Sequence, residues 1–93
     1  MIRTFADKET EKIYHQGYSK KFPREIQDVA LRKLIMIDNA KRIEDLMVPP
    51  SNRLEKLLKE RRNQYSIRIN NKYRVCFSTD GKDYYDVEIV NYH

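Results

Sequence analysis

The sequence predicts an α+β fold in which two early helices pack on a small, mainly antiparallel sheet formed late in the chain. Amphipathic stretches with helical spacing fill the first half of the sequence, and runs that alternate apolar and polar residues fill the second half. Asn70-Asn71 and Asp80-Gly81 separate these runs, and both pairs suit tight hairpin turns. We therefore expect one domain, residues 1–93, with the order β-α-α-β-β-β-β.

The N-terminal half is expected to supply one strand and both helices. Residues 2–5 are a strand candidate that is free to join the sheet beside a later strand. Asp7 suits the N-cap of a helix that runs to about Gln16, and Gly17 ends it. Pro23 opens a second helix, where its missing N–H group is tolerated. Its apolar stripe is the expected cover of the sheet and comprises Ile26, Val29, Ala30, Lys33/Leu34, Ile37 and Ala40.

The C-terminal half is expected to form an antiparallel meander. Residues 43–46 suit one further helical turn, and Val48-Pro-Pro50 then leads through an extended connector into a strand over about 53–57. Arg68 and Arg74 are expected on the open face of the following strands. The opposite, apolar face collects Tyr65, Ile67, Ile69, Tyr73, Val75, Phe77, Tyr85, Val87 and Ile89.

Composition points to a polyanionic partner. Lysine and arginine number 19 against 14 acidic residues, which gives a net charge of +5 and favours RNA, DNA or an acidic protein, although many small domains are mildly basic. Cys76 is the single cysteine and the histidines are His15 and His93, so we expect no disulfide, metal site or cofactor. The sequence contains no membrane-length apolar run and no signal peptide, and a cytoplasmic location is expected.

The residue types needed to cut RNA occur near the expected open face. Cleavage requires a proton to leave the 2′-OH, stabilisation of the charged phosphorane, and a proton to reach the 5′-oxygen. Arginine binds phosphate through a fixed fork of donors, while histidine and tyrosine transfer protons. Arg68 and Arg74 lie on strands joined by a short turn, and Tyr92 and His93 follow the last strand. These side chains suit either phosphate chemistry or the role of solvated charges.

Several segments together resemble the HigB toxins of the RelE/ParE superfamily. The matching segments are PPSNRLEKL, QYSIRIN, KYRVCF and the terminal DVEIVNYH, and residues 1–5 and 32–34 match as well. Members of this family adopt a compact α/β fold, and the RelE-like members cut mRNA on the ribosome. The resemblance therefore implies a type II toxin–antitoxin toxin that acts as a ribosome-dependent, metal-independent endoribonuclease, or mRNA interferase, with the 2′-OH as nucleophile.

The resemblance also implies site residues, each identified by its motif. The catalytic set it implies is Arg74, Asn91, Tyr92 and His93. The basic segment implied for RNA or ribosome binding comprises Lys56, Lys59, Arg61 and Arg62, and Arg68 joins this set from the open sheet face.

The sequence departs from the family pattern in three places. Many relatives read LKGDR where this chain reads Leu57-Leu58-Lys59-Glu60-Arg61, so Leu58 occupies the usual lysine position. Tyr73 stands where relatives often have tryptophan, which is a packing change. Asn91 replaces the usual aspartate and cannot ionise, which shifts the expected proton transfer to His93.

The resemblance implies partners and leaves two other functions open. The implied partners are a HigA-like helix-turn-helix antitoxin, the ribosome at its 30S A site, and mRNA, with operator DNA contacted only through the antitoxin and no membrane. One alternative is a ParE-like toxin that acts on DNA gyrase and does not cut RNA. The other is an inactive RNA-binding or antitoxin-binding module. Arg74 together with Tyr92 and His93 favours the nuclease.

Overall fold

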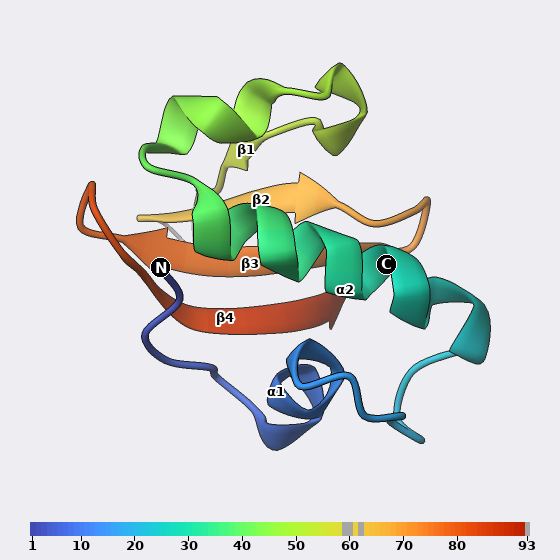
Figure 1. The fold of residues 1–93 in the computed structure, drawn as a ribbon. Helices are drawn as coiled ribbons and strands as arrows, with labels where there is room; N and C mark the ends of the chain where they lie inside the picture. Colours follow the sequence, from blue (N-terminus) through green and yellow to red (C-terminus); the bar gives the residue numbers. More distant parts are fainter. Residues whose placement is uncertain (59–60, 62, 93) are drawn as a thin grey trace.

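The computed structural model describes residues 1–58, 61 and 63–92, and within these ranges an α+β fold is present (Figure 1). Four strands form one antiparallel sheet in the order β1-β2-β3-β4. The helices are α1 (Lys8–Tyr14) and α2 (Arg24–Asn39), with short 3-10 helices η1 (Ile43–Met47) and η2 (Pro50–Asn52). The strands are β1 (Glu55–Lys56), β2 (Gln64–Arg68), β3 (Tyr73–Thr79) and β4 (Tyr84–Asn91).

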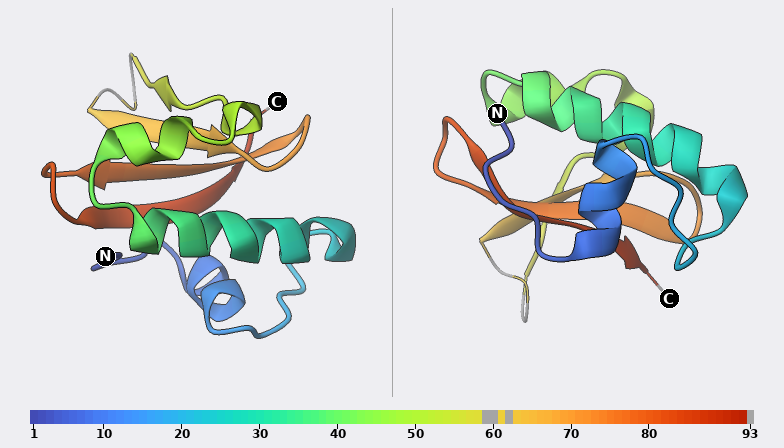
Figure 2. Two further views of the ribbon diagram at one scale, coloured as in Figure 1. Left: turned by 45° about the horizontal axis from the view of Figure 1, so that its top comes forward. Right: turned by 60° about the horizontal axis from the view of Figure 1, so that its bottom comes forward.

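Helix α2 covers one face of the sheet, as the apolar stripe predicts. In the right view of Figure 2, α2 runs along one side of the sheet, and β4 ends toward the other side. Its buried residues Ile26, Leu34 and Ile37 belong to the same core cluster as the strand residues Ile67, Val75 and Phe77. Each fully buried side chain of this kind contributes about 1.5–3 kcal/mol through removal of apolar surface from water.

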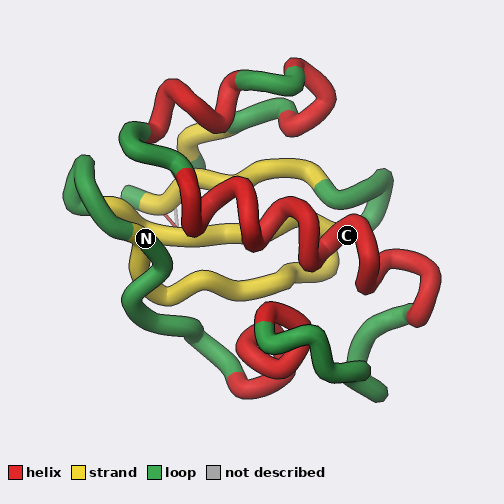
Figure 3. Tube along the Cα trace, viewed as in Figure 1, coloured by secondary structure: helices red, strands yellow, loops and turns green. Residues whose placement is uncertain are grey.

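Residues 2–5 do not form the predicted first strand. They make two isolated parallel bridges to β4, Ile2 with Tyr84 and Phe5 with Val87, and the segment is drawn as loop in Figure 3. Side chains replace part of the backbone ladder: the hydroxyl of Thr4 accepts from the Asp86 N–H at 2.8 Å. The irregular edge of β4 thus prevents a continuous strand pairing while the N-terminal segment still covers that edge.

The inward tyrosine of β4 is Tyr84, and the prediction of Tyr85 was wrong. The register between β3 and β4 shifts between Cys76 and Ser78, and Asp86 has φ 54°. This bulge adds one residue to β4, so the alternation changes phase along the strand. Tyr84 is fully buried, and its hydroxyl donates to the Ala40 carbonyl at the end of α2 at 3.1 Å.

Two element boundaries also differ from prediction. Asp7 caps α1 as expected, accepting from the Thr10 N–H at 2.7 Å, but the helix ends at Tyr14 and Gln16 takes a positive φ of 66°. The strand expected over 53–57 is reduced to Glu55–Lys56. It starts late because Arg53 ends η2 in the left-handed region, with φ 46° and ψ 55°.

Candidate functional site

The open face of the sheet carries a row of polar side chains. The register pairs Glu55 with Ser66, Ser66 with Cys76, and Cys76 with Glu88, so these four residues share one face. Arg68 and Arg74 are paired across β2 and β3 and lie on that same face. The predicted position of both arginines on the face away from the apolar core is therefore confirmed.

A groove lies at one end of this face, beside the turn between β2 and β3. We call it the arginine groove, and its volume is about 630 Å³. Segments distant in the sequence meet in it, since η2, β2, β3 and the C-terminal end all contribute. Its lining residues are Pro50, Ser51, Arg53, Arg68, Asn70, Asn71, Arg74 and Tyr92.

Arg74 is held on two sides. Its Nε donates to the Ser66 hydroxyl at 2.8 Å, and its Nη2 donates to the Arg53 carbonyl at 2.5 Å and to the Ser66 carbonyl at 3.4 Å. These bonds fix the plane of the guanidinium and do not use Nη1. A guanidinium fixed in this way is preorganised to bind an anionic oxygen.

Tyr92 lies against Arg74. The guanidinium carbon is 5.5 Å from the ring centre, within the range of a cation–π contact. The Tyr92 backbone N–H donates to the Lys72 carbonyl at 2.6 Å, which fixes the residue just beyond β4. Burial raises the pKa of the Tyr92 phenol, the nearby Glu55 and Cys76 raise it further, and Arg74 and a hydrogen bond with the Ser66 side chain oppose the rise.

Two more arginines give the groove its charge. The Nη2 of Arg68 donates to the side-chain oxygen of Asn71 at 2.5 Å, within the turn that follows β2. Arg53 lines the groove from the other side, where its backbone also binds Arg74. The groove is therefore lined by three arginines together with serine, asparagine and tyrosine residues, a composition suited to binding phosphate groups.

Comparison with known proteins identifies a family that matches nearly the whole chain. A family model described as the RelE-like toxin of the type II toxin-antitoxin system HigB matches residues 3–93. The chain belongs to this family. The similar curated proteins include Toxin HigB-1 of Vibrio cholerae serotype O1, which is 36% identical over 78 residues, covering 83% of this chain and 82% of that protein.

Two further proteins are similar to this chain. An uncharacterized protein of Haemophilus influenzae is 35% identical over 80 residues, covering 85% of this chain and 79% of that protein. Among solved structures, the YoeB-YefM complex from Staphylococcus aureus matches with a TM-score of 0.57 and 18% identity, covering 100% of this chain and 98% of that chain. At this identity the structural match supports the fold alone.

The other predicted site residues of this HigB-like toxin are spread over different surfaces. Arg61 lies on the open face but forms an ion pair with Glu88 at 3.3 Å and a hydrogen bond with Gln64 at 3.1 Å. Lys56 is exposed on β1, in register with Tyr65, and so points to the face opposite Glu55. Lys59, Arg62 and His93 lie outside the described residues.

Asn91 is separated from Arg74 by the sheet. It pairs with Tyr73 at the end of β4. The Tyr73 side chain packs on the helix-covered face, so Asn91 lies on that face as well. It lines a second groove of about 460 Å³ with Pro23, Glu25 and Ile26 at the start of α2. The two predicted catalytic residues that the structure brings together are therefore Arg74 and Tyr92.

Sequence reasoning missed Arg53 and Ser66, which bind Arg74, and Glu55, which acts electrostatically on Tyr92. Ser66 alternates with Ile67 in a predicted strand and was two positions from Arg68, so its place on the open face was available from the pattern. The role of Arg53 was hidden because its contact is made by a backbone carbonyl. Glu55 was assigned to a strand without any expectation about which side chains it would face.

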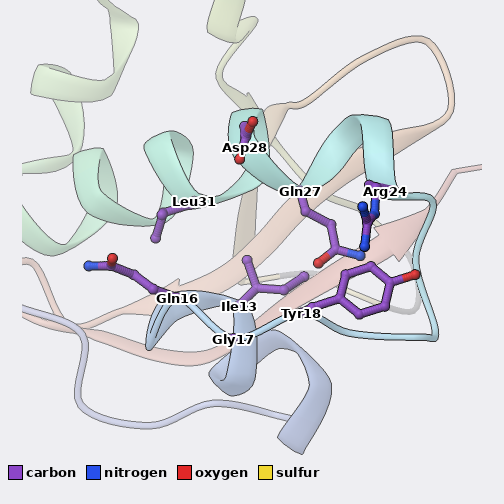
Figure 4. Close-up of a pocket in the computed structure, with 8 residues that line it drawn as sticks. All are labelled: Ile13, Gln16, Gly17, Tyr18, Arg24, Gln27, Asp28 and Leu31. Carbon is purple, nitrogen blue, oxygen red and sulfur yellow. The ribbon is translucent and has the colours of Figure 1, made fainter.

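A third hollow of about 480 Å³ lies between α1 and α2, away from the arginine groove (Figure 4). Tyr18 stands at its rim, and the Arg24 guanidinium carbon lies 4.8 Å from the centre of the Tyr18 ring. None of the predicted site residues that the structure describes lines this hollow. No helix in the described part of the chain is long and apolar enough to cross a membrane.

Proposed function

We propose that this toxin is a metal-independent endoribonuclease that cuts mRNA in the 30S A site of the ribosome. The observation that carries the proposal is the Arg74 guanidinium, held by Ser66 and Arg53 against the Tyr92 ring inside a groove with two further arginines. This arrangement supplies anion binding and a proton donor at one place. Together these two functions account for most of what phosphodiester transfer requires.

In the proposed reaction the 2′-oxygen attacks the adjacent phosphorus, and the bond from phosphorus to the 5′-oxygen breaks. The products are a 2′,3′-cyclic phosphate and a 5′-hydroxyl end. Arg74 stabilises the extra negative charge of the phosphorane through its fixed N–H donors. Tyr92 keeps its proton at neutral pH because its pKa is raised, so it suits donation to the departing 5′-oxygen.

The base that removes the 2′-OH proton is assigned to His93, which lies outside the described residues. Histidine has a reference pKa of about 6.5, close to the value suited to proton transfer at neutral pH. Glu55 is the acidic side chain that acts on Tyr92 electrostatically and is the second candidate base. Asn91 cannot ionise. It pairs with Tyr73 and lines the neighbouring groove, so its proposed role is to shape that groove and not to transfer a proton.

The ribosome has a specific part in this proposal. A host that positions the scissile phosphate beside Arg74 would supply orientation that contributes several kcal/mol. A chain of net charge +5 is also attracted to ribosomal RNA. Free RNA is therefore expected to be a poor substrate, and Lys56, Lys59, Arg61, Arg62 and Arg68 are the proposed phosphate contacts.

A toxin of this kind requires a partner that holds it inactive. A solved structure that shares this fold is described as a complex of YoeB with YefM. We propose that this chain likewise binds an antitoxin, of the HigA-like helix-turn-helix type, and reaches operator DNA only through it. Ribosomes and mRNA place the proposed activity in the cytoplasm.

The test is cleavage of a defined reporter mRNA by the purified chain, with and without translating ribosomes, followed by mapping of the new 5′ ends. The expected result is cutting within the A-site codon that persists when transition metals are removed by a chelator selective for them and magnesium is kept at the level that holds ribosomes intact. New 5′ ends should carry hydroxyl groups. Absence of cutting, combined with inhibition of DNA gyrase supercoiling, would instead support the ParE-like alternative. Absence of both would leave an inactive binding module.

A further inference from the structure

Lys33 is a buried cation on α2. Only 9% of its surface is exposed, although lysine is almost never buried without a partner. Its Nζ donates to the side-chain oxygen of Asn52 at 2.5 Å, and among the described residues no carboxylate lies within ion-pair distance of it. At Lys33 the buried face of α2 thus makes a polar contact directed at η2.

Asn52 receives this contact and is itself fully buried. Its side-chain nitrogen donates to the Leu46 carbonyl at 3.1 Å, so the amide uses both of its ends. Its backbone N–H donates to the Pro49 carbonyl at 2.9 Å. Asn52 therefore ties η2 to α2 and to η1 at the same time, and the side chain has one orientation that satisfies these partners.

The next residue connects this contact to the arginine groove. Arg53 takes a left-handed conformation, and its backbone N–H donates to the Pro50 carbonyl at 3.0 Å. A non-glycine residue in this region persists where its surroundings hold it. The Arg53 carbonyl accepts the Nη2 donor of Arg74. The direction of that carbonyl therefore depends on the placement of Asn52, one residue before it.

We propose that Lys33 and Asn52 are positioning residues for Arg74. Their hydrogen bond holds residues 50–53 against α2, and the Arg53 carbonyl then holds the guanidinium in the groove. Burial, and then the charges of Arg32 and Arg68, lower the pKa of Lys33. Because Arg68 lines the arginine groove, this effect agrees with a position of Lys33 near the groove. The cleavage part of the proposal rests on the proposed function, whereas the positioning part stands without it.

The first test measures position and needs no activity. In ¹⁵N spectra of the whole chain, the Nε–H of Arg74 is expected to exchange slowly with water because it donates to Ser66. Lys33→Met and Asn52→Ala should both speed that exchange and shift the signal. Ala30→Gly is the matched control, because Ala30 is buried on the same helix and its change lowers stability without touching η2. An unchanged Arg74 signal in both variants would overturn the proposal.

The second test measures single-turnover cleavage on the ribosome. Both variants should lower the maximal rate about tenfold to a hundredfold, as expected for a misplaced catalytic group, with little change in the half-saturating ribosome concentration. Asn52→Ala removes the hydrogen bond but keeps the charge of Lys33. Equal losses of rate in the two variants would therefore assign the effect to positioning and not to that charge. Loss in Lys33→Met alone, or a loss mainly in half-saturation, would overturn the positioning role.

A double-mutant cycle links the effect to Arg74. In an Arg74→Lys background, whose low rate stays measurable, Lys33→Met should cause a much smaller further loss of rate, while its effect on thermal unfolding should remain. Lys33→Met with Asn52→Leu replaces both polar partners by apolar ones and is expected to recover stability without recovering the rate. Recovery of both would make the pair purely structural. A wild-type chain that does not cut mRNA refutes the proposed function, and the Arg74 signal still decides the positioning role.

Discussion

The Arg74 guanidinium carbon lies 5.5 Å from the centre of the Tyr92 ring. This contact links β3, in the interior of the sheet, to the C-terminal end of the chain. The contact has two opposing effects on Tyr92. The arginine charge favours ionisation of the phenol, but burial, Glu55 and Cys76 oppose it, and the pKa is raised. Tyr92 thus remains a neutral donor beside a permanent cation, which is the combination expected where a phosphate oxygen must be both stabilised and protonated.

Arg74→Ala should abolish mRNA cutting and growth inhibition. Loss of one preorganised donor in a catalytic site raises the barrier by about 3 kcal/mol or more. Arg74→Lys should rescue poorly, because an ammonium cannot bind Ser66 and Arg53 together in the same fork. Rates are measured by single-turnover cleavage, and circular dichroism checks that each variant is folded. Full activity in the alanine variant would remove Arg74 from the site.

Tyr92→Phe should lower the rate by the same factor at every pH between about 6 and 9. The phenol has a reference pKa of about 10, and its pKa is raised in the folded protein, so it stays largely protonated throughout this range. The measurement is a pH–rate profile of both proteins. A wild-type rate that falls between pH 7 and 9, with a flat profile for the phenylalanine variant, would show that the phenol ionises early.

Deletion of Tyr92 and His93 should eliminate cleavage while fold and antitoxin binding remain nearly intact. The core residues of the last strand are Tyr84, Val87 and Ile89, all of which precede the deletion. His93→Gln should lose most of the rate if the imidazole is the base. A bulky C-terminal tag should impair cleavage where an N-terminal tag does not. Wild-type rates from the two-residue deletion would place the chemistry elsewhere.

Neutralising Lys56 and Lys59 together should weaken ribosome association and flatten its salt dependence, by about 0.7–0.9 in the logarithmic slope for each lost phosphate contact. Lys82 is exposed in the turn between β3 and β4, and Lys82→Gln serves as the control. Arg61→Gln should change the slope less, since Glu88 already compensates its charge. Association is measured by sedimentation at several salt concentrations. An unchanged slope in the double variant would identify both lysines as solvated charges.

Expression of the intact chain without a companion antitoxin should inhibit growth or yield almost no protein. Arg74→Ala should restore growth and yield, because it removes the proposed activity and leaves the core intact. The measurement is colony formation and soluble yield under one inducible promoter. Abundant, harmless expression of the wild type would contradict a toxic activity in the host used.

The family segments and the alternating runs pointed to Arg68, Arg74 and Tyr92, and these three residues line the arginine groove. Arg74 was predicted on the open face because it alternates with Tyr73 and Val75, and the structure confirms that position. The resemblance grouped Asn91 with Tyr92 because both belong to the terminal segment that matches the family's motif. Adjacent residues in a strand point to opposite faces, so the sheet separates Asn91 from Arg74.

The sequence by itself determined the α+β class, the amphipathic α2 and the two-residue alternation of β2 and β3, because these depend on local spacing and on burial of one face. Only the tertiary structure decided the phase of β4, where the bulge at Asp86 puts Tyr84 in the core. It also decided what holds Arg74. The Ser66 hydroxyl and the Arg53 carbonyl come from segments that meet only after the sheet forms and α2 packs against η2, and no local pattern encodes a backbone carbonyl's direction.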